Sequence, residues 1–168
     1  MGQAHDAALL ARSAVMGAGG ASPVVRALLW ERVAWASARS RDDTGARRAL
    51  DAVDDAYEDR SHGVIEPEWV YWLDRSEIDV MAGRCLIELG SPDAAEPLLS
   101  NAIASYDTDH AREVALYLSW LAEAYAKTGN FDAAGDAFAR AHRTAHGINS
   151  ARLDLRFNQV GTLLPGES

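Results

Sequence analysis

The sequence predicts an all-α fold, a right-handed solenoid of about three helix pairs with flanking helices. Three observations lead to this prediction. Apolar residues recur at i, i+3, i+4 and i+7 through most of the chain, which is the period of an amphipathic helix. Val, Ile and Thr never cluster with the period-2 alternation of a strand. Short turns separate the helical stretches, and short turns after long helices favour antiparallel pairs.

Turn-forming residues divide the chain into eight expected helices. Ser22 followed by Pro23 is a good N-cap with proline at the first helical position. Gly90 and Gly129 stand where helices should end, because glycine adopts the left-handed conformation without a steric penalty. The helices are expected over residues 4–16, 22–40, 44–58, 67–89, 92–105, 110–128, 131–146 and 149–163.

The length and composition favour a single domain over residues 1–168. Hydrophobic residues make up 48% of the 168 residues, which is enough for a sizeable core. We expect this domain to contain a lone N-terminal helix, three helix pairs and a C-terminal capping helix. These parts cover residues 4–16, then 24–58, 67–105 and 110–146, and finally 149–163.

The charge balance and the apolar pattern exclude several classes of function. Asp and Glu total 25 against 16 Lys and Arg, a formal charge of −9, so we expect no direct nucleic-acid binding by this chain. No stretch approaches the roughly 20 apolar residues of a transmembrane helix, and we expect no membrane role. The N-terminus lacks the basic segment of a secretion signal. The single cysteine, Cys85, fits a reducing compartment, so the simplest location is the cytoplasm.

The last helix pair carries a regular pattern of small and large residues. Ala122 and Ala134 let the two helices approach closely. Leu121, Tyr125 and Phe138 fill the groove on either side of that contact. The spacing recurs upstream at Gly83, Leu86, Gly90, Ala95, Leu99 and Ala102, and less closely at Trp30, Val33, Ala34, Ala46, Leu50 and Val53.

This pattern resembles the tetratricopeptide repeat, in which W-x₂-L-G-x₂-Y is followed by A-x₃-F over about 34 residues. Leu118 stands in place of the tryptophan, Ala122 in place of the glycine, and His146 where the family usually has proline. The interval from Gly90 to Gly129 exceeds the period of the family, so the helices or linkers are lengthened. Such a repeat cannot bury its apolar face alone, and neighbouring repeats are expected to cover it.

The two ends of the chain differ from the repeats. Residues 149–163 are expected to form a polar-faced capping helix, which a solenoid needs at its end. Residues 4–16 look like the second helix of a pair whose first helix is missing. We expect either that the chain was cut from a longer protein or that this lone helix acts as a cap.

Two longer strings narrow the resemblance. They are PEWVYWLDRSEIDVMAGRCLIELGSPDAAEPLL at 67–99 and HAREVALYLSWLAEAYAKTGNFDAA at 110–134. Both are similar to the C-terminal repeat domain of actinobacterial Xre-type helix-turn-helix transcriptional regulators. The resemblance implies a DNA-binding domain before residue 1 in the native gene, and a sensing, dimerising or partner-binding role for this chain. No helix-turn-helix is expected within residues 1–168 themselves, so DNA binding is not assigned to them.

Helix periodicity predicts which residues line the concave groove of such a solenoid. They are Glu31, Trp35 and Arg39 in the first repeat, Glu77, Val80, Arg84 and Ile87 in the second, and Ser119, Glu123 and Lys127 in the last. Arg84 and Lys127 are candidates to hold the anionic end of a ligand, the alternative being solvated or mutually paired charges. The carboxylate-clamp repeats that bind chaperone C-termini use Lys and Asn at their clamp positions. At those positions this chain has Glu31, Val80, Ser119, Trp35, Arg84 and Glu123, which excludes that role.

Aromatic residues gather at the start of the first helices of the repeats. Trp35, Trp69 and Trp72 are the better candidates for a ligand or peptide pocket in the groove. Trp30 matches a core position and Trp120 adjoins Leu121, so packing between repeats is the alternative interpretation of the cluster.

The sequence offers no catalytic, cofactor or metal motif. His142 and His146 have a spacing compatible with a metal, but neither a third ligand nor an HExxH motif accompanies them. Cys85 has no motif-placed histidine and is expected to be a buried, inert thiol. The GAGG at 17–20 lacks the preceding strand and the GK[ST] ending of a phosphate loop. We therefore expect a protein that is not an enzyme and holds no cofactor.

Three functional hypotheses follow. The first is the regulatory repeat domain of a transcriptional regulator, which binds a protein, a peptide or a small molecule in its groove and dimerises. The second is a standalone adaptor or scaffold that holds two protein partners. The third is an accessory protein or enzyme of a biosynthetic pathway, which predicts a deep pocket with buried carboxylates or histidines. The spacing of such residues does not favour the third hypothesis.

Overall fold

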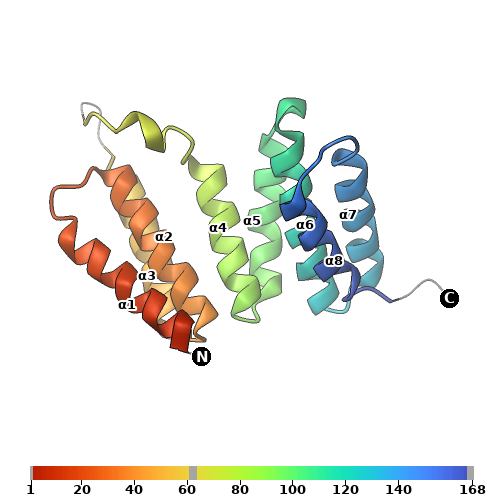
Figure 1. Cartoon of the computed structure of the whole chain (residues 1–168), viewed down its shortest axis with the longest axis horizontal. Helices are drawn as coiled ribbons and strands as arrows, with labels where there is room; N and C mark the ends of the chain where they lie inside the picture. Colours follow the sequence, from red (N-terminus) through yellow and green to blue (C-terminus); the bar gives the residue numbers. More distant parts are fainter. Residues whose placement is uncertain (1, 61–63, 166–168) are drawn as a thin grey trace. The chain divides into compact units, whose positions relative to one another are not determined.

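The computed structural model describes residues 2–60 and 64–165. This part of the chain contains eight α-helices, two short 3₁₀ turns and no strand, which confirms the all-α prediction (Figure 1). The helices are α1 (Gly2–Gly17), α2 (Pro23–Arg39), α3 (Asp43–Glu58), α4 (Arg75–Glu88), α5 (Pro92–Ser105), α6 (Ala111–Lys127), α7 (Phe131–Thr144) and α8 (Ala151–Gly161). The 3₁₀ turns are η1 (Glu68–Val70) and η2 (Thr108–His110). None of these helices is long and apolar enough to cross a membrane.

The chain forms two compact units, Met1–Leu89 and Gly90–Ser168. The boundary falls inside the predicted helix pair 67–105, so that α4 belongs to the first unit and α5 to the second. Each unit is defined by the contacts within it. The expectation of a single domain over residues 1–168 stays a prediction.

In the first unit, α2 is the central helix and packs against α1, α3 and α4. Small residues on its buried face, including Ala34 and Ala38, lie fully buried against Ala46 and Ala49 of α3. Removing side-chain volume at such a contact lets two helices approach closely. A second apolar cluster surrounds the N-terminal part of α2. It comprises Val24, Ala27, Val53, Ala56, Tyr57, Val70, Leu73, Ile78 and Met81.

In the second unit, α6 is the central helix and packs against α5, α7 and α8. Ala122 of α6 and Ala134 of α7 are both fully buried, as the predicted close contact requires. Leu118 and Leu121 are buried as well, whereas Tyr125 is half-buried and its hydroxyl donates to Glu96 Oε1 at 2.9 Å. The two small residues predicted at the contact are therefore buried, and α6 packs against α7.

The expected helix over 67–89 is wrong in its first third. α4 begins only at Arg75, where the side chain of Asp74 accepts a hydrogen bond from the Glu77 backbone N–H at 2.9 Å. This N-cap fixes the helix start, because Asp74 itself has an extended backbone. Before it, Val70 and Leu73 are buried in the core, and their spacing of three also fits a helical period.

The end of α2 differs from other helix ends. Gly90, Gly129 and Gly147 follow α4, α6 and α7 with φ between 76° and 80°, in the left-handed region. After α2 that region is occupied by Arg41, with φ of 62°. A side chain in this conformation costs roughly 1–2 kcal/mol, which glycine avoids.

We expect Arg41→Gly to raise the free energy of unfolding by about 1 kcal/mol, because it removes this steric cost. Chemical denaturation measures the change. Arg41→Ala is the matched control, since it removes the same guanidinium and keeps the strained Cβ. Equal stability of the glycine and alanine variants would contradict a steric cost of the left-handed backbone at Arg41.

Candidate functional site

Four of the predicted groove residues meet between α2 and α4. The Arg84 guanidinium lies over the Trp35 ring, with Cζ 4.5 Å from the ring centroid. Arg39 approaches the same ring at 5.9 Å, and its Nη1 donates to Glu88 Oε1 at 3.1 Å. Trp35, Arg39 and Arg84, together with Glu31 one turn before Trp35, are called the α2–α4 cluster below. It offers an aromatic face flanked by two guanidinium groups.

Glu31 is the buried acid of this cluster, with 2% of its surface exposed. Burial raises its pKa, while the charges of Arg32 and Arg84 oppose that rise. Its Oε2 lies 3.2 Å from Arg32 Nη1 but makes no hydrogen bond. A buried carboxylate oxygen without a hydrogen bond destabilises the folded state, so Glu31 lowers the free energy of unfolding of the first unit.

Cys85 lies next to Arg84 and is fully buried. Burial, followed by the negative charge of Glu31, raises the pKa of its thiol to about 12. A thiol with this pKa is protonated at neutral pH and is a poor nucleophile.

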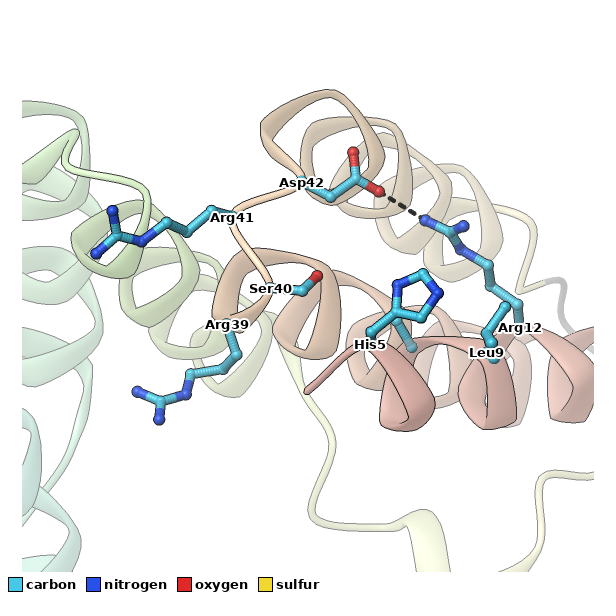
Figure 2. Close-up of a pocket in the computed structure, with 8 residues that line it drawn as sticks. His5, Leu9, Arg12, Arg39, Ser40, Arg41 and Asp42 are labelled. Carbon is cyan, nitrogen blue, oxygen red and sulfur yellow. Dashed lines mark hydrogen bonds and ion pairs between the residues drawn. The ribbon is translucent and has the colours of Figure 1, made fainter. Parts of the chain in front are cut away.

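A cavity of about 540 Å³ lies beside the turn between α2 and α3 (Figure 2). Its lining residues are His5, Ala8, Leu9, Arg12, Arg39, Ser40, Arg41 and Asp42. Arg12 Nη2 donates to Asp42 Oδ2 at 2.8 Å across the cavity. Figure 2 shows the Arg39 and Arg41 guanidinium groups extending to the same side of the turn, away from the Arg12–Asp42 pair. Arg39 therefore belongs both to the α2–α4 cluster and to the cavity wall.

Asp42 fixes this turn as the N-cap of α3. Its Oδ1 accepts from the Gly45 backbone N–H at 2.9 Å. That hydrogen bond, with the contribution of Arg12, holds the pKa of Asp42 below its ordinary value. The cap and the ion pair together hold the cavity wall in place.

The predicted groove residues of the second unit are used internally. Ser119 is fully buried, and Arg156 of α8 donates to its Oγ at 3.1 Å and to its carbonyl oxygen at 3.3 Å. Arg156 also pairs with Glu123, which forms a second ion pair with Lys127 at 2.8 Å. Burial tends to raise the pKa of Glu123, but the charges of Arg156 and Lys127 bring it below its ordinary value. This group of residues stabilises the second unit.

The remaining predicted site residues lie in α4 and in the segment before it. Trp69 and Trp72 lie in the segment that precedes α4, and 58% of the Trp69 surface is exposed. Glu77 is half-buried in the first turn of α4, and Val80 and Ile87 of the predicted groove face are buried. None of these residues joins the α2–α4 cluster.

Three important residues escaped the sequence analysis. Arg12 and Asp42 are separated by 30 positions, and periodicity gives no signal for such a pair. Arg156 is separated from Ser119 by 37 positions. It directly precedes Phe157, however, on a helix whose buried stripe is Leu153, Phe157 and Val160. An arginine beside an apolar stripe was the available signal.

His142 of α7 and His146, which follows the end of that helix, do not form a metal site with other ligands. The His142 ring packs against Phe138 at 4.6 Å and Phe157 at 4.3 Å, measured between ring centroids. Within residues 5–60 and 64–165, no group of three or more His, Cys, Asp or Glu side chains is arranged to hold a metal ion.

Comparisons with protein-family models, with curated proteins and with solved structures find no match to this chain.

Proposed function

We propose that this chain is a non-catalytic binding module, the regulatory repeat domain of a cytoplasmic transcriptional regulator. Its helix pairs would stack as a tetratricopeptide-like right-handed solenoid. The pairs α2–α3 and α6–α7 support this proposal, since each buries small residues where its two helices meet. The sequence resemblance supplies the link to transcription.

The α2–α4 cluster is the observation that supports ligand binding most directly. Trp35 provides an apolar face, and Arg39 and Arg84 place positive charge beside it. A guanidinium suits a carboxylate or a phosphate, because it donates two parallel hydrogen bonds. Arg39 also links the cluster to the cavity of about 540 Å³, whose size is typical of small-molecule sites. The proposed ligand therefore has an anionic group and an apolar part.

The chemistry of the cluster favours binding over catalysis. The Cys85 thiol, with a pKa of about 12, is not an activated nucleophile. Glu31 is buried and faces arginines, and such a carboxyl group serves to position them.

Transcript profiling after deletion of the gene tests the regulatory role. We expect a small, reproducible set of transcripts to change in the native host and to return when the gene is restored. An unchanged transcript profile would overturn the proposal.

A protein adaptor is the second candidate function. The exposed side chains of Trp69 and Tyr71 favour it, because large exposed apolar patches are typical of protein–protein contacts. An adaptor predicts that gene deletion leaves transcripts unchanged and separates two proteins that otherwise copurify.

A further inference from the structure

We propose that the surface around the α3–α4 connection of the first unit binds a basic peptide segment of a partner protein. This surface consists of the exposed apolar residues Val64, Ile65, Trp69, Tyr71 and Trp72 with the exposed acids Asp55, Glu58 and Glu68. We call it the acidic aromatic surface. The inference goes beyond the proposed function, because it does not depend on a ligand at the α2–α4 cluster.

The aromatic rings of this surface are exposed on a firmly held backbone. Val70 and Leu73 of the same segment are buried in the core beside Val53 and Tyr57. The Val70 backbone N–H donates to the Pro67 carbonyl oxygen at 3.1 Å, and the Leu73 N–H donates to the Val70 carbonyl oxygen at 3.0 Å. The backbone that carries the rings is therefore held in place, which reduces the backbone entropy lost on binding.

Glu66 anchors the segment to the start of α2. Its Oε1 accepts from the Val24 backbone N–H at 3.1 Å, and its Oε2 accepts from the Ser22 hydroxyl. One carboxylate thus satisfies the N-terminus of α2 and holds the connection in place. Figure 1 shows residues 64–74 leading to the start of α4.

Apolar exposure at this surface is large. The exposed fraction reaches 88% for Tyr71 and 93% for Ile65. Exposed aromatic residues on an ordered scaffold are typical of the anchor residues of protein interfaces.

The charge of the sequence segment that carries the rings indicates a cationic partner. Residues 54–74 contain seven Asp or Glu and one Arg, so they carry six of the nine net negative charges of the chain. Some of these acids are used internally, since Asp54 pairs with Arg75 and Asp59 pairs with Arg26. Among the described residues, Asp55, Glu58 and Glu68 have no cationic partner. Acids beside exposed rings suit arginine or lysine, which pair with carboxylates and lie over aromatic faces.

The first unit already uses this pairing internally. The Arg60 guanidinium lies 3.6 Å from the centre of the Tyr57 ring, at the end of α3. A second copy of this chain is disfavoured as the occupant, because a two-fold contact would place the same acids against one another.

The acidic aromatic surface lies at the opposite end of α2 from the α2–α4 cluster. Val24 and Trp35 are eleven positions apart on this helix, which corresponds to about 16 Å along its axis. Substitutions at one surface therefore leave the other intact, and the two proposals can be tested separately.

A titration with a short peptide of Arg-Gly repeats tests the inference, with fluorescence anisotropy of the labelled peptide as the readout. We expect binding to the intact chain at low salt, and a loss of affinity of at least tenfold in Trp69→Ala with Tyr71→Ala. Glu58→Gln with Glu68→Gln should weaken binding to a similar extent and reduce its salt dependence. Arg84→Gln should have no effect.

Phe131→Ala with Asp136→Asn is the matched control, because it removes an exposed ring and an exposed acid from α7 of the second unit. It should bind like the original chain. Circular dichroism verifies that every variant is folded. The proposal is overturned if the intact chain does not bind the peptide, if the ring variant binds it equally well, or if a Gln-Gly peptide binds as tightly.

Discussion

Arg156→Ala is expected to lower the free energy of unfolding of the second unit by about 3 kcal/mol at neutral pH. Arg156 is the cationic partner of Glu123, and both side chains are largely buried. Its removal leaves the Glu123 carboxylate with Lys127 alone and leaves the Ser119 carbonyl oxygen without its side-chain donor. A largely buried carboxylate that keeps only one partly exposed cationic partner is strongly destabilising.

The loss should depend on pH in a defined direction. The ion pairs hold the pKa of Glu123 below its value in the unfolded chain, so the stability that they contribute is present above the unfolded pKa. That contribution is lost as the pH falls through the folded-state pKa. Chemical denaturation across pH should therefore show a large difference between Arg156→Ala and the original chain at pH 7 and a small one in acid.

Two further variants test this explanation. Arg152→Ala removes an exposed arginine from the same helix and should change stability by less than about 0.5 kcal/mol. Adding Glu123→Gln to Arg156→Ala should restore part of the stability, because it removes a largely buried charge that has lost its buried partner. Two results would contradict the importance of the Arg156–Glu123 pair. One is an equal loss of unfolding free energy in Arg152→Ala and Arg156→Ala, and the other is a loss in Arg156→Ala that Glu123→Gln does not reduce.

Glu31→Gln is expected to raise the free energy of unfolding of the first unit by about 2 kcal/mol above neutral pH. The carboxylate is buried and one of its oxygens makes no hydrogen bond, so its charged form is costly in the folded protein. Glutamine has nearly the same shape and no charge.

The pH dependence of this gain is opposite to that at Glu123. Burial raises the pKa of Glu31, so the folded protein holds this proton more tightly than the unfolded chain. The associated stability is fully present below the unfolded pKa, near 4.5, and is lost as the pH rises through the folded-state pKa. The gain from Glu31→Gln should be near zero at pH 4 and should grow toward pH 8. A gain that does not vary with pH would assign the effect to packing.

The helix pairs could be predicted from the sequence because their determinants are local. The alternation of small and large residues around Ala122 and Ala134 specifies a close helix contact. The same periodicity placed Glu31, Trp35 and Arg39 on one helix face, and the structure brings Arg84 to that face from α4. A spacing of four is enough to align side chains along a helix.

The start of α4 could not be predicted because competing local signals were present. Val70 and Leu73 have helical spacing, but they anchor a 3₁₀ turn and the residues after it. The cap formed by Asp74 decides where the helix begins. Aspartate three residues before Glu77 was a recognisable N-cap signal, and the apolar period obscured it.

The internal partners of the groove residues in the second unit could not be predicted either. The repeat pattern left Ser119, Glu123 and Lys127 free of packing roles, and periodicity says nothing about long-range partners. The capping helix α8 was expected to present a polar face, yet Arg156 of that face pairs with Glu123. An ion pair between positions 33 residues apart depends on how the helices pack.

We propose that the α2–α4 cluster is the regulatory binding site of this chain. Transcript profiling in the native host tests it most directly, with three strains that carry Arg84→Gln, Arg112→Gln or a deletion of the gene. Arg112 is exposed on α6, so its substitution removes an equal charge outside the cluster. We expect Arg84→Gln to reproduce the transcript changes of the deletion and Arg112→Gln to match the original strain. An Arg84→Gln profile that equals the original, with the protein present at normal levels, would contradict it.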